Sequence, residues 1–303
     1  MAVTMMRQDY SSSLSNFAEP SHPCAITELG RRDEPEAIEF LSARPLHTVF
    51  MSGLVRDNGM VSPRNRGSFY GSRKLSGQLE AVALIGHATL VEAHTENALI
   101  GFARMARRCQ NAHLIRGEQE SINIFWSHYA DPGHEPRRIC SEHLFEISRA
   151  RPGFADLAGL RLAEMSDLEK VINVNASLAF AESGINPLQQ DPSGFRSRAM
   201  RRIEQKRMWV WVEDSRLMFK ADLIGETPDV AYLEGVYVHP EERRKGYGSR
   251  CLSKLVSLLL AQKRSICLTA NDQNKIAMAF YPKVGFEFCS YYETIYLRPE
   301  SRA

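Results

Sequence analysis

A run of three cations, Arg243–Lys245, stands directly before two glycines, Gly246 and Gly248, at the expected start of a helix. Glycine lets the backbone approach a ligand closely and adopt positive φ angles. The first N–H groups of a helix have no partner within the helix, and they carry the positive end of its dipole. Adjacent cations add charge and further donors. This stretch therefore suits an anion, and a diphosphate fits better than a carboxylate because several donors need several acceptor oxygens.

Two common phosphate motifs are excluded at this turn. The dinucleotide fingerprint G-x-G-x-x-G needs glycine at position 251, where the chain has Cys251. The loop G-x-x-x-x-G-K-[ST] is absent because Lys245 precedes the glycines. An ordinary strand-to-helix turn with solvated basic residues remains an alternative. The net charge of +2 gives no global argument for nucleic acid or an acidic membrane, so an anion site must be local.

The elements that position this turn belong to the second half of the chain. A strand is expected up to Met165, followed by a helix whose capping box pairs Ser166 with Glu169. A loop at 183–194 and a basic helix at 195–206 come next; the helix lacks interleaved aromatics, so a solvated face is favoured over nucleic-acid binding. The remaining pattern predicts strands at 208–214, 217–225 and 230–238, a helix at 248–263, a strand at 265–272, a helix at 274–284 and one or two strands at 286–297.

The first half shows the same order of elements. Strands are expected at 25–30, 66–73, 79–86, 88–93, 112–117 and 139–148, with helices at 33–43, 95–108 and 118–129. A segment with Pro and Gly, 149–158, separates the halves and is expected to be a linker. A duplicated α/β (α+β) domain is the simplest interpretation.

Composition is typical of a globular protein, with 44% hydrophobic and 24% charged residues. The six cysteines are scattered without a Cys-x-x-Cys pair, which favours reduced thiols. The N-terminus has no basic-then-apolar segment, and the longest apolar run is too short to span a bilayer. We therefore expect a cytoplasmic protein that does not enter membranes. The histidines show no metal-ligand spacing, so no metal is predicted.

The motif R-x-x-G-x-G from Arg243, followed about thirty residues later by NKIAMAFYPKVGF from Asn274, resembles the GNAT acyltransferase family. In that family an R/Q-x-x-G-x-G/A turn between the fourth strand and the third helix holds acyl-CoA. The resemblance covers roughly residues 159–297. The phrases ESGINPLQQDP, LMFKADL and LEGVYVHPE are similar to two-part bacterial GNAT proteins with an uncharacterised N-terminal domain.

The resemblance implies tandem GNAT-like domains, each with a mixed, mostly antiparallel sheet flanked by helices. The expected division is a flexible tail at 1–23, a degenerate GNAT-like domain at 24–148, the linker, and an acyl-CoA-binding catalytic domain at 159–303. The first half lacks the anion site, since ATLVEAHTENALIG has neither a basic cluster nor a glycine pair where strand passes into helix. Its expected role is structural: completing the sheet, covering the acceptor site or joining subunits.

The resemblance also assigns residues to the chemistry of acyl transfer from acetyl-CoA to an amine. Glu234, the only carboxylate in VAYLEGVYV, is the expected base, although it could instead hydrogen-bond a neighbouring strand. Tyr281 is the expected acid for the leaving thiolate, against the alternative of a core tyrosine. The loop after the first helix of this domain suggests Glu182, Asn186 and Asp191 as acceptor contacts. The implied acetyl-CoA-binding residues are Val236, Tyr237, Val238, Arg243, Arg244, Lys245, Gly246, Tyr247, Gly248, Ser249 and Asn274.

Two classes of function remain open at this point. One is an N-acetyltransferase that acts by direct attack in a ternary complex. The other is a catalytically silent protein that senses acyl-CoA or recruits a partner. The presence of Glu234 and Tyr281 beside an intact anion turn favours the enzyme. The acceptor's identity and the oligomeric state, including a homo-oligomer, stay open.

Overall fold

The computed structural model describes residues 25–131, 135–151 and 159–298. The expected tail and most of the expected linker lie outside these residues. In the first half the strands are β1 (Ile26–Glu28), β2 (Gly67–Arg73), β3 (Leu79–Gly86), β4 (Ala88–Ala93), β5 (Leu114–Glu118) and β6 (Arg138–Ile147). Its helices are α1 (Glu34–Ser42), α2 (Pro45–Asn58), α3 (Glu96–Ala106) and α4 (Gln119–Tyr129).

The second half repeats this order. Its strands are β7 (Leu160–Leu162), β8 (Met208–Glu213), β9 (Arg216–Glu226), β10 (Val230–Val238), β11 (Ser265–Asn271) and β12 (Glu287–Tyr296). Its helices are α5 (Leu168–Ser183), α6 (Pro187–Gln190), α7 (Pro192–Glu204), α8 (Tyr247–Leu260) and α9 (Lys275–Val284). No helix among the described residues is long and apolar enough to cross a membrane.

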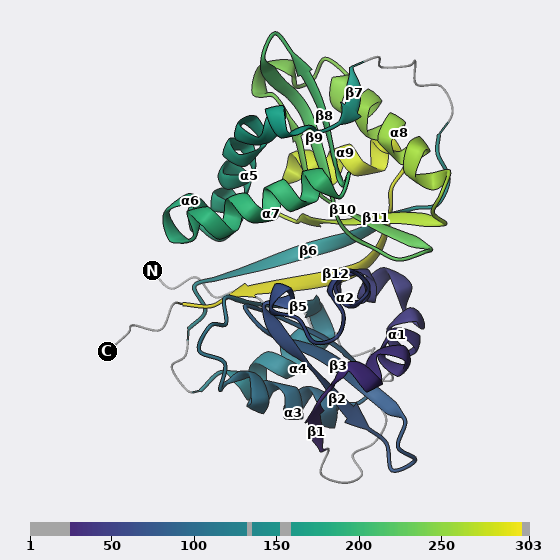
Figure 1. The fold of residues 1–303 in the computed structure, drawn as a ribbon, viewed down its shortest axis with the longest axis vertical. Helices are drawn as coiled ribbons and strands as arrows, with labels where there is room; N and C mark the ends of the chain where they lie inside the picture. The colour runs from purple at the N-terminus through teal and green to yellow at the C-terminus, as the bar shows by residue number, and fades with distance from the viewer. Residues whose placement is uncertain (1–24, 132–134, 152–158, 299–303) are drawn as a thin grey trace, which may run out of the picture.

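All twelve described strands form one continuous sheet in the order β1-β2-β3-β4-β5-β12-β6-β11-β10-β9-β8-β7. The last strand of each half is exchanged: β12 pairs with β5 of the first half, and β6 pairs with β11 of the second. The two exchanged strands pair with each other across the middle of the molecule (Figure 1). Most neighbours are antiparallel; β4·β5 and β10·β11 are parallel. The predicted mixed, mostly antiparallel sheet flanked by helices is confirmed.

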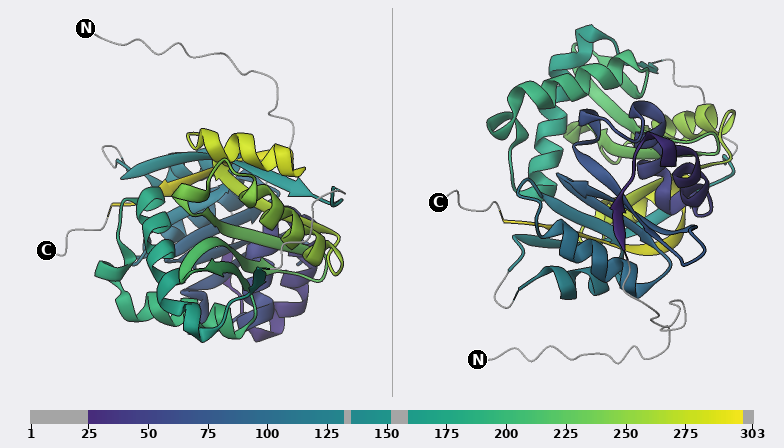
Figure 2. Two further views of the ribbon diagram at one scale, coloured as in Figure 1. Left: turned by 90° about the horizontal axis from the view of Figure 1, so that it is seen from above. Right: turned by 60° about the horizontal axis from the view of Figure 1, so that its bottom comes forward.

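Apolar side chains cover both faces of the sheet. On one face α8 and α9 pack on the second half around Leu252 and Leu255, while α3 and α4 pack on the first half around Phe102 and Phe125. On the other face α5 and α7 cover the second half, and α1 and α2 cover the first. Figure 2 shows this layered arrangement from two further directions. Successive side chains of a strand point to opposite faces, and strands such as β3 and β9 are buried along nearly their whole length, so each face of the sheet has its own core.

Helix α2 joins the two halves on this second face. Its Gly53 lies so close to β9 that an added Cβ would be 3.1 Å from the Glu226 backbone nitrogen. At the end of α2, the Asp57 carboxylate accepts from Arg207 of the second half at 2.9 Å. A close helix–strand approach and a partly buried ion pair therefore fix the first half against the second.

Three local expectations need correction or comment. The helix α2 was not expected, although Pro45 at its first position and Gly59 just after it, at φ 79°, are ordinary helix signals. The Ser166 capping box is wrong: α5 begins at Leu168, and the Asp167 carboxylate instead accepts from the Glu164 N–H at 2.9 Å. The expected solvated face of the basic helix α7 holds ion pairs, among them Arg202–Asp222 and Arg198–Asp191.

Candidate active site

Strands β10 and β11 separate shortly after they begin, which opens a slot in the sheet. Their parallel pairing covers only Val230 to Tyr232 on β10. Beyond that point β10 carries a bulge against β9, between the pairs Glu234–Asp222 and Tyr237–Lys220. Gly235, in the bulge, has φ 61°, a left-handed conformation that favours glycine. The slot therefore exposes backbone groups of β10 that a regular sheet would bury in hydrogen bonds.

The start of α8 has the features expected of an anion site. Gly246 is its N-cap residue with φ 86°, and no side chain caps the helix among the described residues. No atom lies within 4 Å of an added Gly246 Cβ, whereas a Gly248 Cβ would lie 2.9 Å from the Val238 side chain. Arg244 also has a positive φ, 64°, and is exposed. Gly246 therefore permits the turn, and Gly248 permits close packing of α8 on β10. The free backbone amides at the start of α8 lie beside the cations that precede it.

A cavity of about 400 Å³ lies next to the slot, between the two halves. Its floor is formed by strands of the central sheet. Its walls are α2 of the first half and α5 with α7 of the second, through residues such as His47, Phe50, Leu178 and Arg202. Five of the predicted residues line it: Glu182, Glu234, Val236, Asn274 and Tyr281. The first half thus walls the space beside the slot as well as completing the sheet.

Glu182 and Glu234 form an acidic pair in this cavity. The Glu182 side chain reaches solvent in the cavity, but the cavity walls surround it. Desolvation by the surrounding cavity walls, reinforced by the negative charges of Glu234 and Glu142, raises the pKa of Glu182 to about 7, even though part of the side chain is exposed. A carboxyl group with that pKa can take up or release a proton near neutrality, which is what a general base needs.

Tyr281 lies on α9 and is 8% exposed. Its ring packs against Phe145, Phe280 and Phe286, so the aromatic contacts fix its orientation. Burial, together with the negative charge of Glu182, raises the pKa of Tyr281, which keeps the phenol protonated. Its hydroxyl has no hydrogen-bond partner among the described residues. Asn274 has a structural use, since its Oδ1 caps α9 by accepting from the Ala277 N–H at 3.1 Å.

The floor of the cavity is held by a charged network around Arg116 of β5. The guanidinium donates to the Tyr232 hydroxyl at 2.8 Å and to the Thr269 hydroxyl, and it pairs with Glu142 at 3.1 Å. Thr294 of β12 donates to the same Glu142 at 3.2 Å. The network joins five strands from both halves, so it fixes the floor of the cavity across the exchanged strands.

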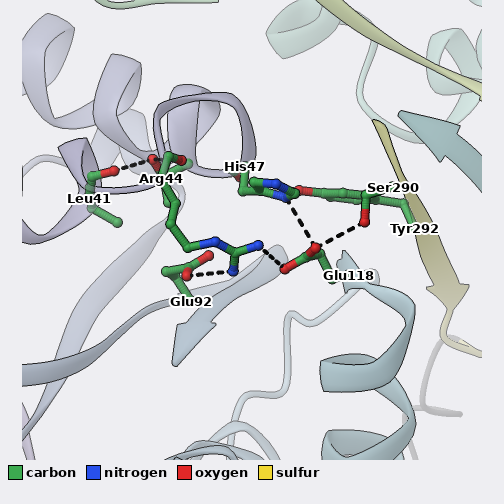
Figure 3. A network of polar contacts seen from close by, with 8 residues as sticks. Leu41, Arg44, His47, Glu92, Glu118, Ser290 and Tyr292 are labelled. Atoms are coloured by element: carbon green, nitrogen blue, oxygen red, sulfur yellow. Dashed lines mark hydrogen bonds and ion pairs between the residues drawn. The ribbon is translucent and has the colours of Figure 1, made fainter. Parts of the chain in front are cut away.

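The first half has a corresponding slot, but its own side chains fill it. Strands β4 and β5 pair in parallel only as far as Leu90, so Glu92 stands in the same register position as Glu234 on β10. Arg44 pairs with Glu92 at 2.9 Å and with Glu118 at 2.5 Å, and bridges the two strands where they separate (Figure 3). His47 approaches Glu118 at 3.3 Å in the same network.

The helix that follows this slot is also closed to an anion. Thr95 caps α3, and its hydroxyl accepts from the Ala98 N–H at 3.4 Å. No Lys or Arg lies between β4 and α3. The sequence of the first half lacks the basic cluster and the glycine pair of the second. In the structure, this difference appears as a slot filled by Arg44 and a helix start capped by Thr95.

Two predicted acceptor contacts lie apart from the cavity. Asn186 caps α6 through the Leu188 N–H at 3.0 Å, and Asp191 caps α7 through the Gly194 N–H at 2.9 Å. Neither is among the residues that line the cavity. Sequence reasoning missed the Arg116 network and the polar pair Lys220 and Asp222. A Lys and an Asp two residues apart in the apolar strand LMFKADL were the available signal for the second, because such residues share one face.

Comparison with known proteins agrees with this geometry. The model of the Acetyltransferase (GNAT) family matches residues 180–286, which include the slot, the α8 turn and α9. Residues 180–286 are therefore the part of the chain that matches a GNAT domain. No curated protein matches the sequence. GNAT enzymes in general transfer acyl groups from acyl-CoA to amines.

Solved structures extend the likeness to the whole chain. A Drosophila protein has a TM-score of 0.66 at 12% identity, covering 91% of this chain and 99% of its own. A GCN5-related N-acetyltransferase from Sphaerobacter thermophilus has 0.57 at 12%, covering 91% and 95%. A tandem GNAT protein from the clavulanic acid biosynthesis pathway has 0.56 at 13%, covering 92% and 100%. At these identities the likeness shows the fold alone: tandem GNAT-like domains.

Within the described residues, no group of three or more His, Cys, Asp and Glu side chains could hold a metal ion.

Proposed function

We propose that the protein is an N-acyltransferase that transfers an acetyl group from acetyl-CoA to a small primary amine by direct attack in a ternary complex. One observation carries the proposal: the slot between β10 and β11 lies between an uncapped helix start and a cavity that holds the acidic pair Glu182 and Glu234 and the buried phenol of Tyr281. The pyrophosphate of acetyl-CoA, its thioester and the amine would then each have a binding site, one after another along the slot.

The α8 turn would bind the pyrophosphate of CoA. Its open amides and the cations Arg243, Arg244 and Lys245 supply donors and charge. The backbone of Val236, Tyr237 and Val238, on the edge of β10 that β11 leaves, would hold the pantetheine arm, with Ser249 and Tyr247 beside the phosphates and Asn274 in the lining of the cavity. Positioning of this kind lowers the entropy cost of reaction.

The acidic pair would receive the amine. An ammonium is attracted by Glu182 and Glu234, and Glu182 can accept its proton because its pKa is about 7. This modifies the sequence-based hypothesis, in which Glu234 was the base and Glu182 an acceptor contact. Tyr281, kept protonated by burial, would donate to the leaving thiolate. The cavity volume of about 400 Å³ suits a small amine better than a protein side chain on a folded surface.

The test is titration calorimetry with acetyl-CoA, with NAD and ATP as controls, followed by a free-thiol assay across polyamines, amino acids and aromatic amines. We expect about one acetyl-CoA per chain, since the slot of the first half is filled. Thiol release with an amine, reduced in Glu182→Gln, would support the enzyme. Binding without release with any amine would favour the alternative, a catalytically silent acyl-CoA sensor. Absence of binding would contradict both.

A further inference from the structure

Lys220 of β9 is fully buried, which is rare for a lysine. Its Nζ pairs with the Asp222 carboxylate on the same strand at 2.9 Å. Asp222, whose side chain is 4% exposed, also accepts from Arg202 of α7 at 2.9 Å. Burial of an ion pair costs free energy unless its geometry is well satisfied, so an apolar residue would be the ordinary choice here. The lysine therefore needs an explanation in what else it touches.

Its other contact is the bulge of β10. Nζ donates to the Gly235 carbonyl oxygen at 3.1 Å. Between the Glu234–Asp222 and Tyr237–Lys220 pairs, β10 has one residue more than β9, which turns this peptide out of the ladder. A buried carbonyl removed from a ladder must find another donor. Lys220 supplies that donor, and an amine can donate whether or not it is protonated.

The orientation of one peptide bond connects this contact to the slot. The Gly235 C=O and the Val236 N–H belong to the same peptide unit, and in a trans peptide these bonds point in opposite directions. While Lys220 holds the carbonyl, the Val236 N–H must therefore point away from Lys220. Val236 lines the cavity. We propose that Lys220 is a positioning residue that fixes the Val236 N–H as the hydrogen-bond donor to the thioester carbonyl, an inference that rests on the proposed function.

The surroundings of Gly235 restrict alternatives to this arrangement. A Cβ at this position would lie 2.7 Å from Lys220 Nζ and 3.6 Å from the Asp222 carboxylate. Glycine is therefore needed both for φ 61° and for the close approach of the amine. Arg202 extends the chain of contacts to α7, so the wall of the cavity and the donor peptide are held by one buried network.

The experiment compares Lys220→Met with Lys263→Met. Lys263 is a matched control: its Nζ pairs with Glu226 of β9 at 2.8 Å and donates to the Thr227 carbonyl at 2.7 Å, but at the far end of the hairpin. We would measure kcat, KM and Kd for acetyl-CoA with the best amine of the panel, and thermal stability. A mispositioned donor costs about 10²-fold in rate. Lys220→Met should lose kcat by about that factor with Kd for acetyl-CoA nearly unchanged, and Lys263→Met should keep kcat.

Unchanged kcat in Lys220→Met, or an equal loss in Lys263→Met, would overturn the proposal. Should Lys220→Met not fold, Gly235→Ala perturbs the same contact from β10 and should give the same loss. If the wild-type protein transfers acetyl to no amine, the proposed function fails separately. Crystal structures of the wild type and Lys220→Met then decide the positioning role: the Gly235–Val236 peptide should turn in the variant, and retention of its orientation would refute it.

Discussion

Charge reversal at Arg244 tests the anion site directly. Arg244 is exposed, and its side chain makes no ion pair or hydrogen bond among the described residues, so Arg244→Glu should change the free energy of unfolding by no more than about 0.5 kcal/mol. The backbone is no obstacle, because Arg and Glu are both unbranched at Cβ and the cost of φ 64° is similar for the two. Any large effect on CoA binding must then come from charge.

The magnitude follows from Coulomb's law. A unit charge pair 4 Å apart gains about 1 kcal/mol in water and about 4 kcal/mol at an effective dielectric constant near 20. Because Arg244 is exposed, the lower figure applies. Reversal replaces attraction with repulsion, so binding should weaken by about 2 kcal/mol, or roughly 30-fold in Kd. The loss should shrink at high ionic strength because salt screens exposed charges.

Calorimetric titration with CoA at two salt concentrations measures both effects. Lys206→Glu is the matched control, since Lys206 is exposed and has φ 57° but follows α7, apart from the α8 turn. It should bind CoA like the wild type. Gly246→Val, which places a side chain in the open space beside the helix start, should also weaken binding. Wild-type Kd in Arg244→Glu at low salt would refute the assignment of the pyrophosphate to this turn.

Further predictions concern the two acidic slots and the phenol. Arg44→Met should lower the free energy of unfolding by about 2 kcal/mol in denaturant titration, because it leaves the buried Glu92 unpaired; a variant of wild-type stability would contradict the role of this ion pair. In a pH profile, kcat/KM should rise with pH, with a midpoint near 7, as Glu182 loses its proton. Glu234→Gln should lower this midpoint because it removes a negative charge that repels the Glu182 carboxylate. An unchanged midpoint would show that Glu234 does not influence the group that titrates. Tyr281→Phe should lower kcat about 10²-fold in the thiol assay with little change in melting temperature, and unaltered kcat would leave Tyr281 a packing residue.

Local patterns predicted most elements, including the strand-to-helix turn before α8. The sequence RRKGYG between a strand and an amphipathic helix contains nearly all that the α8 turn needs, because its charges, glycines and helix start are contiguous. The exchange of β6 and β12 could not be predicted in this way. The residues of both segments indicate a strand, but such a local pattern does not specify which neighbour the strand pairs with.

The site shows the same division between local and distant information. Glu234 and Tyr281 were found from short motifs, and both line the cavity. The pKa of Glu182 on α5 is raised first by desolvation in the cavity and then by Glu234 of β10 and Glu142 of β6, so the sequence around Glu182 does not reveal the shift. The contact of Lys220 with Gly235 likewise depends on a bulge in the neighbouring strand. The chemistry of Glu182 and Lys220 therefore depends on residues that are distant in the sequence and close in the fold.

The two slots show what the fold alone provides and what side chains decide. Both halves pair two parallel strands over three residues and then let them separate, with a glutamate two residues further along β4 and β10. In the first half Arg44 neutralises Glu92 and fills the opening, and Thr95 satisfies the helix start. In the second half the opening and the helix start are free of such partners among the described residues, and Glu182 adds a second negative charge. Since the backbone is shared, replacing Thr95 with glycine would free one helix start but leave Arg44 in the slot. Under the proposed function, CoA binding would need an open slot and an open helix start together, and within the described residues the second half combines them.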